Sequence, residues 1–147
     1  MQRARLPPPP LPDLDLCHGS FLVFDPAVSP HYEVFLIPHV PSRYDAMNVP
    51  QSTEWPPSTF TLRVFSSRTK HWEERSFLRQ GPPMGTLADV QAQVQASTRL
   101  HYYSAYAAYH RGRLYVQWSN DFVTRLDTSG LAPRRIARPA SRVGVEV

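Results

Sequence analysis

The sequence predicts an all-β fold built from antiparallel sheets. Its 147 residues include 16 prolines, and aromatic residues make up 12% of the chain. Helix interiors exclude proline at a cost of about 3 kcal/mol, whereas aromatic side chains suit half-buried strands. In addition, apolar and polar residues alternate along short runs that end at Gly, Pro, Asp or Ser, as in strands joined by turns. The length and the hydrophobic share of 41% indicate one domain with a thin core.

Eight runs have this strand pattern. They are FLVF at 21–24, HYEVFLI at 31–37, FTLRVF at 60–65, WEERSFL at 72–78, YSAYAAY at 103–109, RLYVQW at 113–118, FVTRL at 122–126 and PRRIA at 133–137. Alternation is clearest at 60–65, where Phe60, Leu62 and Val64 share one face. Between two of the later runs, Arg111-Gly112 predicts a tight hairpin turn.

Two segments interrupt the strands. Residues 85–97 have apolar side chains at helical spacing behind Thr86-x-x-Asp89, a capping-box pattern, so we expect a short inserted helix near 86–97, with an edge strand as the alternative. Residues 39–58 are rich in proline and show no period, which predicts a long loop. Tyr44 and Trp55 lie in this loop and are candidate partner-binding residues, since aromatic residues on exposed loops often anchor partners. The alternative is that they fasten the loop to the sheet.

An internal repeat indicates how the strands are grouped. VFDPAVSPHYEVFL (23–36) aligns with VFSSRTKHWEERSF (64–77) with one gap, which places Tyr32 on Trp72 at an offset of 40. Two-strand units that recur at about this period are typical of propeller blades, which stack on their neighbours. We therefore expect antiparallel sheets arranged as about two blades of an incomplete kelch-like β-propeller, with Tyr32 and Trp72 as equivalent packed aromatics. Such a piece would leave edge strands, such as 60–65, and would be marginally stable and prone to self-association.

Three segments carry a resemblance to a known family. FLVFDPAVSPHYEVFLIP, EWPPSTFTLRVFSSRTKHWEERSF and AYAAYHRGRLYVQWSNDFVTRLD resemble the C-terminal F-box-associated region of grass F-box proteins, over roughly residues 16–138. The resemblance implies a kelch-like region that captures an unknown target protein for a cullin-type ubiquitin ligase of a plant. A Skp-type adaptor is expected only if a longer gene product supplies an F-box, because the residues before Cys17 are few and rich in proline. The chain is then a fragment or a truncated paralogue that serves as a protein-interaction module.

The two ends of the chain differ from the part between them. Residues 1–15 are expected to form a disordered leader, in which LPPPPLP at 6–12 adopts polyproline II. This run could be a ligand for a proline-reading domain. However, an Arg-x-x-Pro-x-x-Pro ligand that begins at Arg5 would need a proline at position 11, where this sequence has Leu11.

Residues 139–147 are expected to be a basic tail. Arg134, Arg135, Arg138 and Arg142 carry most of the net charge of +4. Because this charge lies at the end of the chain, the sequence disfavours nucleic acid as the partner. The alternative function is nevertheless binding of RNA or another anion through these arginines.

Motifs for catalysis and metal binding are missing from the sequence. It has no Gly-x-Ser-x-Gly elbow, no P-loop and no His-Glu-x-x-His, and its six histidines lack zinc-ligand spacing. We therefore expect no enzyme activity, no catalytic residue, no metal and no cofactor. A single cysteine is typical of a reducing compartment, so a cytoplasmic or nuclear location is expected. No apolar run approaches the ~18 residues of a membrane span, so we expect no membrane partner.

Overall fold

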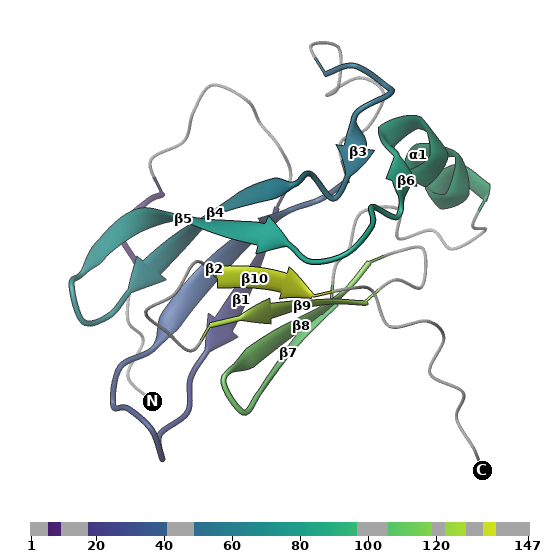
Figure 1. The fold of residues 1–147 in the computed structure, drawn as a ribbon. Coiled ribbons are helices and arrows are strands. Elements are labelled where there is room, and N and C mark those ends of the chain that lie inside the picture. The colour runs from purple at the N-terminus through teal and green to yellow at the C-terminus, as the bar shows by residue number, and fades with distance from the viewer. Residues whose placement is uncertain are drawn as a thin grey trace.

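The computed structural model describes residues 6–9, 18–40, 49–96, 106–118, 123–128 and 134–137. Most of these residues form one eight-stranded sheet with the order β1-β2-β4-β5-β10-β9-β8-β7 (Figure 1). Its strands are β1 His18–Val23, β2 Glu33–Pro38, β4 Thr59–Ser66, β5 His71–Arg79, β7 Tyr106–His110, β8 Arg113–Gln117, β9 Val123–Asp127 and β10 Arg134–Ala137. Two short strands, β3 Glu54–Trp55 and β6 Gly85–Thr86, pair separately and lead into the helix α1 Leu87–Ala96. The predicted all-β class with one short inserted helix is confirmed.

The large sheet consists of two four-stranded antiparallel units. Strands β1, β2, β4 and β5 form the first, and β7 to β10 form the second. A parallel pair joins them, with Arg134 of β10 opposite Phe77 of β5. The two expected four-stranded units are therefore present, but they are hydrogen-bonded edge to edge in one sheet instead of stacked as separate blades.

The edges of the sheet differ from the expected ones. FTLRVF belongs to β4, which pairs with β2 on one side and with β5 on the other. The expectation that it is an edge strand was wrong, because both rows of its backbone groups have a neighbouring strand. The observed edge strands are β1 and β7, and they approach each other. The sheet thus curls around its inner face.

Both units contribute to one hydrophobic core on that inner face. Along β4, Phe60, Leu62 and Val64 are buried and Thr61 is exposed, as the alternation predicts. The other large side chains that are almost fully buried come from β2, β5, α1 and the second unit: Phe35, Ile37, Phe77, Leu87, Val90, Leu114, Val116 and Leu126. Because these residues form a single cluster, neither unit has a core of its own.

The hairpin register supports the internal repeat. Val23 pairs with Glu33 in the β1–β2 hairpin, and Val64 pairs with Glu73 in the β4–β5 hairpin. The two copies of the repeat are therefore equivalent hairpins. Their aromatic residues Tyr32 and Trp72 are half-buried and pack on the same ring, that of Phe65, within the sheet rather than between stacked blades.

Local backbone features follow the predicted turn and capping chemistry. Arg111 and Gly112 both have positive φ, 49° and 77°, as a two-residue hairpin turn of the mirror-image type requires. At the start of α1, the Thr86 N–H donates to the Asp89 carboxylate at 2.9 Å, and the Asp89 N–H donates to the Thr86 hydroxyl oxygen at 3.2 Å. This reciprocal pair confirms the predicted capping box.

Part of the predicted proline-rich loop is well defined. Residues 49–58 contain β3, and the N–H of Leu87 in α1 donates to the Thr53 carbonyl at 2.8 Å. Residues 41–48, most of the leader and the predicted basic tail lie outside the described residues. In the part of the chain that the structure describes, no helix is long and apolar enough to cross a membrane.

Candidate functional site

A cleft of about 370 Å³ opens where the hairpin turns gather at one end of the sheet. The first copy of the repeat contributes Asp25, Val28, Ser29, His31 and Glu33, and the second contributes Ser66, Arg68, Thr69, Glu73 and Arg75. Tyr109 and Thr128 of the second unit also line it. Along the inner face, the apolar residues of β4 give way to Ser66 at this end. The cleft is therefore the polar end of the interior that the curled sheet encloses.

The turn between β1 and β2 forms the apolar part of the rim. Asp25 starts it: its carboxylate accepts the Ala27 N–H at 3.0 Å, and its carbonyl accepts the N–H groups of Val28 and Ser29. An aspartate before a proline favours such a turn because its side chain bonds to the backbone two residues on. The turn leaves Val28 80% exposed at the edge of the cleft.

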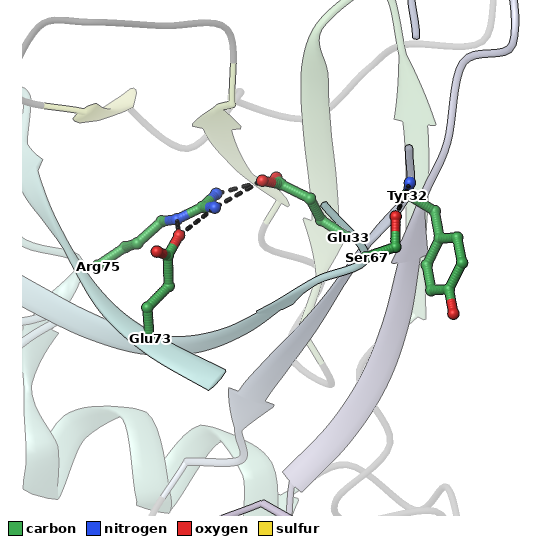
Figure 2. Close-up of polar contacts among 5 residues, drawn as sticks. All are labelled: Tyr32, Glu33, Ser67, Glu73 and Arg75. Carbon is green, nitrogen blue, oxygen red and sulfur yellow. Dashed lines mark hydrogen bonds and ion pairs between the residues drawn. The ribbon is translucent and has the colours of Figure 1, made fainter. Parts of the chain in front are cut away.

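The turn between β4 and β5 is fastened to the first hairpin. The Ser67 hydroxyl oxygen accepts the Tyr32 N–H at 2.8 Å, and the Ser67 N–H donates to the Tyr32 carbonyl at 2.9 Å (Figure 2). Lys70 closes the turn by donating its N–H to the Ser66 carbonyl. These backbone contacts fix the two walls of the cleft relative to each other.

A charged triad lies inside the cleft. Arg75 on β5 donates to both carboxylate oxygens of Glu33 on β2, at 2.9 and 2.5 Å, and also to Glu73 on its own strand (Figure 2). Burial alone would lower the pKa of Arg75, but the hydrogen bonds and negative charges of Glu33 and Glu73 outweigh it, so the pKa is raised. Arg75 therefore stays cationic between the two carboxyl groups.

The cleft combines paired charges with exposed side chains. The charged groups of the triad form ion pairs with one another, whereas Val28, His31 and Arg68 are exposed on the rim. Among the described residues, no group of three or more His, Cys, Asp or Glu side chains is placed to hold a metal ion. An apolar contact, a cation and hydrogen-bonding groups within one concave surface are what a polypeptide ligand needs.

Of the two predicted partner-binding residues, the structure describes Trp55, which does not line the cleft. Trp55 is only 8% exposed, and its ring packs edge-on against Phe60 and Trp118, each with centroids 6.1 Å apart. Rings of two other segments enclose Trp55, as in the alternative that it fastens its loop to the rest of the fold. Tyr44 lies outside the described residues.

The predicted anion-binding arginines are divided between the sheet and the end of the chain. Arg134 and Arg135 belong to β10, which lies between β5 and β9 in the sheet. Arg138 and Arg142 lie outside the described residues. Two of the four predicted anion-binding arginines thus belong to the strand that was expected at 133–137.

The distribution of polar residues in the sequence indicates the cleft, although it does not form a recognised motif. In both copies of the repeat the polar residues are concentrated at the turn between the two strands, in DPAVSPHYE and in SSRTKHWEER. Adjacent antiparallel hairpins place their turns at the same end of the sheet, so these polar segments had to meet.

Comparison with known protein families, with curated proteins and with solved structures finds no match for the chain.

Proposed function

We propose that this chain is a non-catalytic protein-interaction module whose recognition surface is the cleft at the hairpin turns. One observation carries the proposal: all three segments that resemble the F-box-associated region contribute to the cleft lining. Asp25 to Glu33 come from the first segment, Ser66 to Arg75 from the second and Tyr109 from the third.

The surface around the cleft supports this assignment. Val28 is an exposed apolar side chain on the rim, and it lies beside the charged groups of the interior. Exposed apolar groups bordered by polar ones mark interaction sites in proteins. Because both hairpin turns are held by backbone hydrogen bonds, a ligand would meet a preformed surface and would lose less entropy on binding.

In this proposal the module does the work of the target-recognition region of a plant F-box subunit. It holds a target protein, and an F-box in a longer gene product would provide the contact to the Skp-type adaptor of a cullin-type ubiquitin ligase.

A matched pair of substitutions tests the proposal. Val28→Asp places a charge on the rim of the cleft, and Val49→Asp makes the same change near the start of α1, at the opposite end of β4. Both valines are exposed, so both variants should fold. Proteins selected from a displayed plant cDNA library on the full chain should bind Val49→Asp normally and Val28→Asp at least about tenfold more weakly. If no selected protein separates the two variants, the cleft is not the recognition surface.

A further inference from the structure

The proline-rich leader contacts the outer face of the sheet. The indole Nε1–H of Trp72 donates to the carbonyl oxygen of Pro7 at 2.9 Å, which joins β5 to the purple segment of residues 6–9 in Figure 1. Trp72 belongs to a cluster with Phe65 and Tyr32, which we call the aromatic platform. The proposed function does not use this surface.

The aromatic platform is a rigid structure. Phe65 is 3% exposed and lies at its centre, with ring centroids 6.4 Å from Tyr32 and 5.5 Å from Trp72. Phe65 and Trp72 are direct cross-strand partners, and the backbone of Tyr32 is held on Ser67. In Figure 2 the ring of Tyr32 points away from Glu33 and the cleft. The platform and the cleft are therefore separate surfaces.

The leader has the chemistry that such a platform recognises. Prolines fix φ and have no N–H, so a polyproline II segment has no internal hydrogen bonds and its carbonyls are free to accept. An indole N–H can only donate. Aromatic surfaces that combine ring faces with such a donor are the general means of binding proline-rich segments. Leu6, Pro7 and Pro8 remain exposed, so the leader lies on the platform as a shallow, exchangeable cover.

We propose that the aromatic platform is a binding site for proline-rich segments, that residues 6–9 of the same chain occupy it, and that a proline-rich segment of a partner protein binds by displacing them. The leader is then an internal competitor. Because residues 6–9 are joined to β1 by a short segment of the same chain, they compete at an effective concentration of about a millimolar. A leader segment with a Kd of about 100 μM for the open platform would therefore weaken the binding of a competing peptide about tenfold.

The test uses a variant of the full chain, called the opened chain, whose leader is altered so that it no longer covers the platform. In this variant Pro7→Gly, Pro8→Gly, Pro9→Gly and Pro10→Gly remove the fixed backbone and keep the length. The probe is the peptide LPPPPLP, and the readout is the NMR signal of the Trp72 indole N–H, assigned with Trp72→Phe. We expect that signal to shift when the leader is opened and to shift back as the peptide is added.

Controls within the chain and a control peptide test whether LPPPPLP binds at the aromatic platform. The indole of Trp118, which donates to the Thr124 hydroxyl at 3.0 Å inside the core, should not respond to the peptide. The peptide LAAAALA should not restore the Trp72 signal. Adding Trp72→Phe to the opened chain keeps a ring but removes the donor, and should weaken binding of LPPPPLP about three- to tenfold. The unaltered chain should bind the peptide about tenfold more weakly than the opened chain.

Three results would overturn the proposal. One is a Trp72 signal in the opened chain that does not respond to LPPPPLP at millimolar concentration, a measurement that needs no substituted tryptophan to fold. Another is equal affinity of the opened and unaltered chains, which would mean that the leader does not compete. The third is a Trp72 signal in the unaltered chain that changes with protein concentration, which would place the leader on a second copy instead.

Discussion

Arg75 shows how one side chain can join strands that are not neighbours. It reaches from β5 to Glu33 on β2, across the intervening β4, and also binds Glu73 beside it. Only 13% of its side chain is exposed, whereas Glu33 and Glu73 are 25% and 43% exposed. Solvent therefore screens the carboxylates in part, and the triad is worth less than a fully buried network.

We predict that Arg75→Met lowers the free energy of unfolding by about 1–2 kcal/mol, because it removes charged hydrogen bonds and leaves two carboxylates facing each other. Urea denaturation measures the effect. The control is Arg68→Met, at an exposed arginine of the same cleft, which should stay within about 0.5 kcal/mol of the parent chain. Equal midpoints for Arg75→Met and the parent would show that the triad contributes nothing to stability.

Burial of single residues could be predicted only where it follows a period. Phe60, Leu62 and Val64 alternate in sequence, and all three are buried. Trp55 has no such pattern around it, and its burial depends on Trp118, which lies far away in the sequence. Glu73 and Arg75 lie on one strand, but their link to Glu33 depends on the pairing of hairpins, which no local pattern reports.

At the level of elements, strands of four or more residues were predictable and very short ones were not. Each of the eight expected runs corresponds to a strand of the large sheet. The two-residue strands β3 and β6 exist because Glu54 meets Thr86 and Trp55 meets Gly85 across a long intervening segment. Two residues carry too little periodicity for such a pairing to be read from the sequence.

The capping box of α1 predicts an acid-sensitive helix start. The N–H and hydroxyl of Thr86 donate to the Asp89 carboxylate, and these bonds hold the pKa of Asp89 below its ordinary value of 3.8. Because the folded-state pKa is the lower one, the stabilisation is present above the ordinary pKa and is lost as the pH falls through the folded-state pKa.

Amide exchange at the first turn of α1 measures this loss. Protection of Leu87 to Val90 should fall below about pH 4 in the parent chain. Asp89→Asn cannot titrate, so protection in that variant should be weaker at neutral pH and should change less with acid. If the two chains had the same acid profile, the carboxylate would not be the cap that holds the helix start.

At the scale of the whole molecule, sequence patterns could not predict how the two four-stranded units are arranged. Alternation buries one face of each unit whether the units stack as blades or join at their edges. The outcome depends on β10, a strand of four residues that pairs in parallel with β5, far earlier in the chain. The core that results is shared, with Phe77 of β5 and Leu126 of β9 in the same cluster.

In this arrangement β10 links the two units, because it pairs with β5 on one side and with β9 on the other. A pair of truncations tests this role of β10. Removal of residues 134–147 takes away the strand between β5 and β9, which leaves two new sheet edges and opens the shared core. We expect this chain to lose its cooperative thermal transition. Removal of residues 139–147 alone takes away only the predicted basic tail, and we expect the melting temperature to change by no more than about 2 °C, the equivalent of about 0.5–1 kcal/mol. Thermal melting followed by circular dichroism at several concentrations compares the two chains with the parent. A cooperative melt of the shorter chain at the parent temperature would mean that the two units hold together through their faces alone, without the β5–β10 pair.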